Sequence, residues 1–220
     1  IANLAESTET HQFLKNIHLL DSLISELKSN NTNITRESAR AIANLLSSRD
    51  IHPHVTRQGL ADLLDLSRSS CEDCQYLAAL CLRKLAPTKT AQSPLIANGL
   101  PSLALLATKA SLTTKIQAAT ALRDLCASEN HNESFFVADI PRVLVKIVQE
   151  CDRQLEALGV GALRHLSRNA RIKDGFSSSG IAQSVGRCVA WANEDLRSQI
   201  AGLFANLSEW RETHGTLLSQ

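Results

Sequence analysis

Residues 115–127 read KIQAATALRDLCA, and this stretch decides the fold. Its apolar side chains, Ile116, Ala119, Leu122, Leu125 and Cys126, recur at helical spacing, and further small residues lie beside them. A helix that carries alanine and leucine along one face can approach a second helix closely. The pattern therefore predicts an amphipathic helix that is buried along one side.

The end of this stretch, ALRDL at 121–125, recurs along the whole chain. Its counterparts are AIANL at 41–45, CLRKL at 81–85, ALRHL at 162–166 and LFANL at 203–207, with a shortened IANL at 1–4. The closing leucines, Leu4, Leu45, Leu85, Leu125, Leu166 and Leu207, are separated by 41, 40, 40, 41 and 41 positions. A fixed period of this size with helical content is typical of an all-α solenoid, in which each repeat packs on its neighbours.

A second column of residues marks the start of a helix in each repeat. It contains His18, Gly59, Gly99, Asp139 and Gly180, and the next residue is aliphatic in every case. Glycine at three of these five positions predicts a sharp bend with a positive φ between two helices. Pro101 and Pro141 follow at what we expect to be the first turn of a helix. Each repeat should thus contain a short, a medium and a long third helix.

These features resemble the armadillo repeat family. The resemblance rests on the period, on the Gly-Leu-Pro start at 99–101 and on the Ala-Leu-x-x-Leu end at 121–125. It implies a right-handed α-solenoid and one domain over 1–220 that is truncated at both ends. About five complete repeats are expected, at 18–58, 59–98, 99–138, 139–179 and 180–220, after the end of a preceding repeat at 1–17. The HEAT repeat is the alternative, but the glycine bend and the short first helix argue against it.

Composition and net charge limit the classes of function and the compartment that we expect. The formal net charge is +1, which gives no general attraction to nucleic acid or membrane, and no apolar run is long enough to span a membrane. The chain opens inside a repeat, so we expect no signal peptide. Six cysteines form no visible disulfide framework, which suits a reducing compartment. We therefore expect an intracellular protein, cytoplasmic or nuclear or both.

Two columns at the ends of the third helices supply the candidate site. In armadillo proteins the third helices line a concave groove that binds extended peptides or partner helices. The residue before the closing leucine is commonly Asn, whose amide can bind a peptide backbone. The resemblance therefore predicts a partner-binding groove whose residues are Arg83, Lys84, Arg123, Arg164, His165, Asn44 and Asn206.

The arginines of this set, Arg83, Arg123 and Arg164, occupy identical positions in three central repeats. Guanidinium groups bind carboxylates with two hydrogen bonds, and the row is similar to the basic groove of beta-catenin-like proteins, which takes acidic, partly disordered partners. The alternative is that a cation in the last turn stabilises the helix end. Asp124 interrupts the row and could pair with an arginine.

Three glycines lie inside predicted third helices, where each costs about 1 kcal/mol relative to alanine. We expect Gly159 to allow close helix packing. Gly161 and Gly202 occupy the column that holds Trp in the importin-alpha branch, so they leave room for a ligand or for packing. That column contains no Trp here, which argues against the binding of nuclear signals.

Other motifs point away from catalysis and metals. Cys71-Glu-Asp-Cys74 has the spacing of half a zinc site, but no second pair exists, and a helix N-terminus is the alternative. His52-Pro-His54 is expected to be a solvated turn. The chain has no Gly-rich phosphate loop, no nucleophile elbow and no His-Glu-x-x-His. We expect no enzyme, no cofactor, no metal and no small-molecule substrate.

The prediction is therefore a non-catalytic protein–protein interaction scaffold or adaptor that binds an extended, acidic segment or a partner helix. The alternative is a regulatory subunit or chaperone cofactor that clamps a folded domain. Nucleic-acid binding by the same basic row is disfavoured by the near-zero net charge and the single Tyr.

Overall fold

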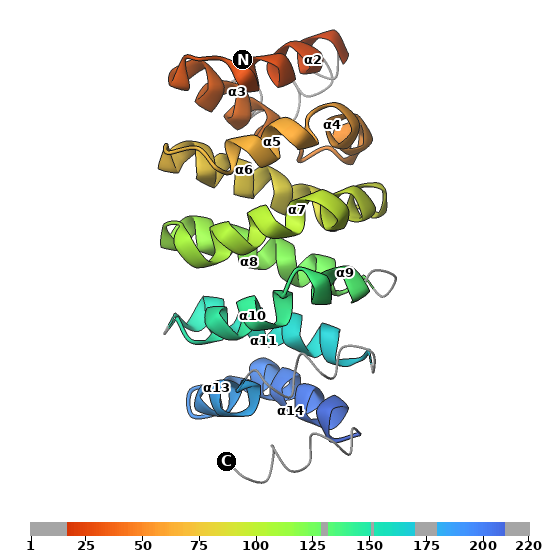
Figure 1. The fold of residues 1–220 in the computed structure, drawn as a ribbon, viewed down its shortest axis with the longest axis vertical. Coiled ribbons are helices and arrows are strands. Elements are labelled where there is room, and N and C mark those ends of the chain that lie inside the picture. The colour runs from red at the N-terminus through yellow and green to blue at the C-terminus, as the bar shows by residue number, and fades with distance from the viewer. Residues whose placement is uncertain (1–16, 129–131, 151, 170–179, 210–220) are drawn as a thin grey trace. The chain divides into compact units, whose positions relative to one another are not determined.

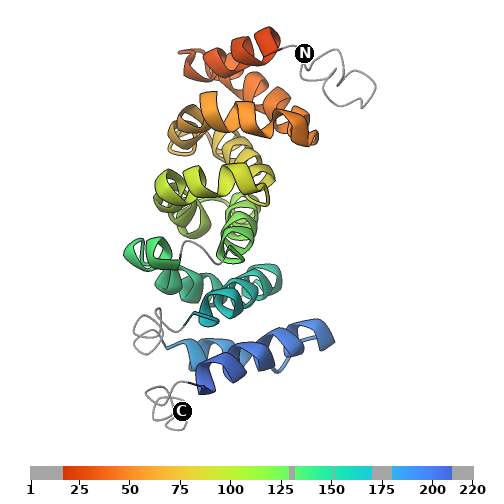
Figure 2. The same ribbon diagram turned by 90° about the vertical axis from the view of Figure 1, so that its right-hand side faces the viewer.

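The computed structural model describes residues 17–128, 132–150, 152–169 and 180–209. Every regular element within these ranges is a helix (Figures 1 and 2), which confirms the all-α prediction. The chain divides into two compact units, 1–121 and 122–220, and the division falls inside α8 (Leu112–Cys126). The partial repeat at 1–17 lies almost entirely outside the described residues, and the single domain over 1–220 stays a prediction.

The first unit contains two complete sets of helices and most of a third. In chain order these are α2 (Ile17–Ser25), the 3₁₀ turn η2 (Glu26–Lys28), α3 (Thr32–Leu45), the 3₁₀ turn η3 (Arg49–Ile51), α4 (His52–Gln58), α5 (Leu60–Leu66), α6 (Glu72–Leu85), α7 (Lys89–Lys109) and most of α8. The third helices α3 and α6 pack against each other, and α5 packs on α6. Neighbouring repeats are thus held together mainly by their long third helices.

The second unit repeats the same scheme. It contains the end of α8, then α9 (Asn132–Val137), α10 (Ile140–Val148), α11 (Arg153–Ser167), α13 (Ile181–Cys188) and α14 (Glu194–Ser208). The second helix α10 packs on the third helix α11, and α11 packs on the next third helix, α14. The order of contacts matches that of the first unit.

The closing leucines form the core that the period predicts. Leu85, Leu125 and Leu166 have no exposed surface, and Leu45 and Leu207 are at most 3% exposed, whereas Leu4 lies outside the described residues. The aliphatic residues that start the second helices are buried as well, apart from the half-buried Leu19; they are Leu60, Leu100, Ile140 and Ile181. Burial of a leucine side chain contributes about 1.5–3 kcal/mol, so one repeated column stabilises every repeat.

The expected glycine bend is only partly present. Gly180 has a φ of 64° and Asp139 a φ of 53°, but Gly59 has a φ of −111° and Gly99 lies inside the continuous helix α7. The predicted positive φ is therefore wrong for Gly59 and Gly99. Gly59 is closely packed, because a Cβ there would lie 3.2 Å from Cγ1 of Ile24.

Helix α7 departs from the expected three-helix repeat. The helix expected before Gly99 and the helix expected after it merge into one helix that contains both Pro94 and Pro101. Pro101 is therefore not in a first turn, whereas Pro141 is in the first turn of α10 as predicted. A proline inside a helix donates no backbone hydrogen bond, so each of the two interrupts the ladder of α7 without ending the helix.

Candidate partner-binding surface

In the first unit, the cation at the end of α6 binds the end of the preceding third helix. Lys84 Nζ donates to the carbonyl oxygen of Ala43 at 2.8 Å and to Oγ of Ser47 at 2.9 Å. The last carbonyls of a helix lack partners within the helix, and a lysine can satisfy them. Burial lowers the pKa of Lys84, and the neighbouring Arg83 lowers it further. Lys84 thus stabilises the α3–α6 contact, and the carbonyl that it binds belongs to the preceding helix α3 and not to its own helix α6.

Asn206 makes the corresponding contact in the second unit. Its Nδ2 donates to Oγ of Ser167 at 2.9 Å and to the carbonyl oxygen of Arg164 at 3.4 Å, both at the end of α11. The amide donor that was expected to bind a peptide backbone therefore binds the preceding repeat. Asn44 occupies the same position at the end of α3 and is half-buried.

The arginines of the row differ in the hydrogen bonds that they form. In the first unit, Nε of Arg83 is buried and has no hydrogen-bond partner among the described residues. In the second unit, Arg123 donates to Oδ1 of Asp124 from Nε at 3.1 Å and from Nη2 at 2.8 Å. The side chain of Arg123 is 40% exposed and that of Asp124 is 24% exposed. Asp124 thus pairs with the arginine beside it and offsets part of its charge.

Gly161 and Gly202 lie against side chains of neighbouring helices. A Cβ on Gly161 would lie 2.9 Å from Oε1 of Gln199 and 3.5 Å from Cδ of Arg123, and a Cβ on Gly202 would lie 2.6 Å from Nε of Arg164. Arg123 of α8 therefore contacts α11 beside Gly161, and Arg164 of α11 lies across α14. The space that Gly202 opens is filled by Arg164, whereas the tight neighbour of Gly161 is the end of Gln199.

Gly159 has a different surrounding, as the sequence predicted. A Cβ there would lie 2.7 Å from Cγ2 of Val148 and 3.2 Å from the carbonyl oxygen of Leu144. Both atoms belong to α10, which packs on α11. The absence of a side chain allows these two helices to approach each other closely.

His165 lies among the cations of the second unit. Burial lowers the pKa of this half-buried histidine, and the Asp124 carboxylate raises it. Three guanidinium groups lower the pKa further, those of Arg168, Arg164 and Arg123. We call Arg123, Arg164, His165 and Arg168 the basic cluster. Arg168 was missed because its column, Ser47, Pro87, Ala127, Arg168 and Glu209, holds a cation in one repeat alone.

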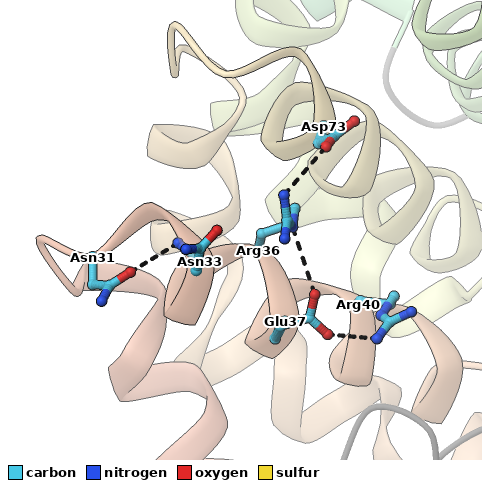
Figure 3. A network of polar contacts seen from close by, with 6 residues as sticks. All are labelled: Asn31, Asn33, Arg36, Glu37, Arg40 and Asp73. Atoms are coloured by element: carbon cyan, nitrogen blue, oxygen red, sulfur yellow. Dashed lines mark hydrogen bonds and ion pairs between the residues drawn. The ribbon is translucent and has the colours of Figure 1, made fainter.

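A second charged group on the third helices belongs to the first unit (Figure 3). Arg36 of α3 lies 3.5 Å from Glu37 and 3.6 Å from Asp73 of α6, and Arg40 donates a hydrogen bond to Glu37. Two carboxylates thus balance the two arginines, and the ion pair with Asp73 joins α3 to α6. The basic cluster differs because, within the part of the chain that the structure describes, three arginines act on His165 and Asp124 is the carboxylate that opposes them.

The histidine motif is structural rather than solvated. His52 is 3% exposed, and its Nε2 lies 2.9 Å from the carbonyl oxygen of Leu46 while Nδ1 lies 2.6 Å from Oγ1 of Thr88. Because a carbonyl only accepts, Nε2 carries the proton. His52 begins α4, and Nε2 of His54 in the same helix lies 2.6 Å from Oδ1 of Asp21. The expectation of a solvated turn is wrong, since both rings join separate helices.

The cysteine motif lies at a helix start. Cys71 is the N-cap residue of α6, and Glu72 and Asp73 are in its first turn, as the helix N-terminus alternative predicts. Within the described ranges, no three His, Cys, Asp or Glu side chains come close enough together to hold a metal ion. In the same part of the chain, no helix combines the length and apolar character needed to cross a bilayer.

Comparison with known proteins identifies the fold. No family model matches the chain, and no curated protein sequence is significantly similar to it. Among solved structures, a designed armadillo repeat protein in complex with the peptide (KR)4 matches with a TM-score of 0.83 and 20% identity over 94% of this chain and 89% of the other. Computationally designed armadillo repeat proteins for modular peptide recognition match with a TM-score of 0.85 and 19% identity over 93% and 89%.

A further solved structure, from a study of cadherin and beta-catenin, is also similar to this chain. A structure from a study of a phosphorylation switch that controls the interaction between cadherin and beta-catenin matches with a TM-score of 0.77 and 23% identity, over 91% of this chain and 41% of the other. Together these likenesses show that the chain has the armadillo repeat fold, an all-α solenoid. This confirms the fold that the repeat period and the Gly-Leu-Pro start predicted.

Proposed function

We propose that this protein is a non-catalytic scaffold that binds an extended, acidic segment of a partner protein on its third helices. The basic cluster carries the proposal, because Arg168, Arg164 and Arg123 act on His165 together, and among the described residues the carboxylate that acts on this histidine is that of Asp124. An acidic segment would relieve the repulsion among these cations, and each guanidinium can bind a carboxylate with two hydrogen bonds.

The glycines against which two of the arginine side chains lie favour such binding. Arg164 lies against Gly202 and Arg123 against Gly161, so both stems are already partly ordered before a ligand arrives. A pre-ordered side chain loses less conformational entropy on binding. Arg123 already donates to Asp124 and would have to divide its hydrogen-bond donors between Asp124 and the ligand. We therefore assign the stronger ligand contacts to Arg164 and Arg168.

Comparison with the designed relatives supports the choice of an acidic ligand. One of those proteins is in complex with the basic peptide (KR)4. The basic cluster of this chain would repel such a peptide, since like charges in contact disfavour binding. A ligand of opposite charge fits the same face.

A binding measurement with matched variants tests the proposal. A fluorescent twelve-residue poly-glutamate peptide is titrated with wild-type protein, with R123A/R164A/R168A and with the control R142A/R187A/R197A, which loses the same charge elsewhere. We expect the cluster variant to lose about tenfold or more in affinity and the control to stay within about twofold, with salt weakening the wild-type complex. Equal losses in both variants would show that net charge alone attracts the peptide and would refute the site.

Two further probes separate the ligand classes. The peptide (KR)4 should not bind, and a single-stranded oligodeoxythymidine of similar charge should bind more weakly than poly-glutamate, because the described part of the face offers few aromatic rings for stacking. Tighter binding of the oligonucleotide would replace the acidic peptide by nucleic acid as the ligand.

His165 provides an independent test of the same surface. A bound carboxylate favours the imidazolium, so an acidic ligand should raise the lowered pKa of His165. By linkage, affinity for poly-glutamate should rise as the pH falls through the pKa of the complex, and H165Q should flatten this part of the profile. NMR titration of the imidazole resonances with and without peptide measures the shift directly.

A folded partner domain is the second candidate. The contact of Asn206 with the end of α11 favours it, because the amide donor that would bind an extended backbone is already used. A regulatory subunit or chaperone cofactor would contact a broad face and depend less on salt. Failure of poly-glutamate to bind, together with salt-resistant capture of one folded protein, would favour this alternative.

A further inference from the structure

The residue before each third helix forms a column that the period defines. It contains Asn31, Cys71, Ser111, Asp152 and Asn193. Three of these side chains cap their helices: Asn31 accepts from the backbone N–H of Asn33 at 3.0 Å, Asp152 from those of Gln154 and Leu155 at 3.0 Å, and Asn193 from that of Leu196 at 2.9 Å. Cys71 is the N-cap of α6 and makes no such hydrogen bond.

The stability of α6 therefore does not explain why a cysteine occupies its N-cap position. Ser, Thr, Asp and Asn are strongly preferred as N-caps because their oxygen atoms accept from the free N–H groups of the first turn. A thiol is a weak acceptor, so α6 starts without the stabilisation that three other third helices have. The substitution of a thiol into a column of capping residues points to thiol chemistry.

The second cysteine lies within reach of the first. Cys74 is the third residue of α6, so it lies in the same first turn as the N-cap residue Cys71. Cys74 is 1% exposed, whereas Cys71 is half-buried and accessible at the helix end. One thiol can thus be reached by a small reagent, and the other is protected within the same turn.

Protonation assigns the order in which the two thiols react. Burial raises the pKa of Cys74 to about 11, and the neighbouring Cys71 thiol contributes to the rise. The thiolate is the nucleophile in disulfide exchange, so Cys74 does not react first at neutral pH. Attack by Cys71, the more exposed of the two thiols, comes first.

We propose that Cys71 and Cys74 form a reversible dithiol–disulfide site that a small-molecule disulfide such as glutathione disulfide oxidises. The Cys71 thiolate attacks one sulfur of glutathione disulfide, which gives a mixed disulfide and releases one glutathione. Cys74 then loses its proton and attacks the Cys71 sulfur, and the second glutathione leaves. Two protein thiols lose two electrons, glutathione disulfide gains them, and the two cysteine protons end on the two glutathione thiols.

The site adjoins the contact between two repeats. Asp73 lies between the two cysteines and forms the ion pair with Arg36 of α3 that Figure 3 shows. The disulfide joins the N-cap to the third residue of α6 and holds the first turn covalently, in place of the missing cap. Oxidation should therefore slow amide exchange in the first turn of α6.

The other described cysteines serve as internal controls. Cys81, Cys126 and Cys188 are at most 2% exposed, and burial raises the pKa of all three thiols. They should stay reduced under the same conditions. Cys151 lies outside the described residues, so the experiment uses a C151S background.

The test is oxidation of the folded chain in glutathione redox buffers, followed by acid quench, alkylation and peptide-resolved mass spectrometry. We expect a disulfide between Cys71 and Cys74, which dithiothreitol reverses. The C74S variant should accumulate a stable glutathione adduct at Cys71, and C71S, which restores a capping residue and should fold, should leave Cys74 unmodified. Persistence of two free thiols in wild type, or of a glutathione adduct at Cys71 that never resolves, would overturn the proposal.

Discussion

Gly159 and Gly161 allow one feature of the packing to be measured with an internal control. The two glycines are buried and lie two residues apart in α11, so replacement by alanine gives both the same gain in helix propensity, about 1 kcal/mol. Their surroundings differ. The new Cβ in G159A lies 2.7 Å from Cγ2 of Val148 and 3.2 Å from a backbone oxygen, whereas that in G161A lies 2.9 Å from the flexible end of Gln199.

The expected stabilities follow from these contacts. Gln199 can rotate away, so G161A should keep most of its propensity gain and be up to about 1 kcal/mol more stable than wild type. G159A forces α10 away from α11, and overpacking of this kind costs about 1–3 kcal/mol. The difference between the two variants should therefore be about 1–3 kcal/mol in favour of G161A, because the propensity gain cancels in the comparison.

Urea denaturation followed by far-ultraviolet circular dichroism gives the free energy of unfolding of each variant. Because repeat proteins can unfold in parts, native-state hydrogen exchange of the α11 amides should accompany it. Stability of G159A equal to or above that of G161A would refute the argument that glycine is required for the α10–α11 approach.

Three further perturbations test other contacts. The pKa of His165 is lowered on folding, so the unfolded chain binds more protons. The free energy of unfolding should therefore fall as the pH drops from about 6.5. Urea denaturation of H165Q should show a smaller dependence on pH. Lys84→Met leaves the carbonyl of Ala43 without its donor and should cost about 1–2 kcal/mol, measured by the same denaturation. Cys71→Ser should stabilise the reduced protein by about 1 kcal/mol, since serine caps α6; an unchanged denaturation midpoint would contradict the account of the N-cap column.

The candidate site could be predicted only in outline. The period correctly set Arg123 and Arg164 at matching positions, and it indicated that Asp124 pairs with an arginine. It did not indicate that Arg168 joins them, because this residue stands one turn farther on in a column without other cations. The resemblance to armadillo repeats implied a ligand contact for Asn206, whose amide binds the end of the preceding helix.

The sequence by itself determined the repeat. A fixed spacing of apolar residues defines which face of each helix is buried, and burial of leucines such as Leu85 and Leu166 needs no information beyond that spacing. Tertiary structure decided what each polar or small residue contacts. Lys84, His52 and Gly202 all meet atoms of other helices, and the local pattern around a residue carries no record of such neighbours. The physical reason is that hydrophobic burial is non-directional and averages over a face, whereas hydrogen bonds and close contacts depend on individual atoms brought together by packing.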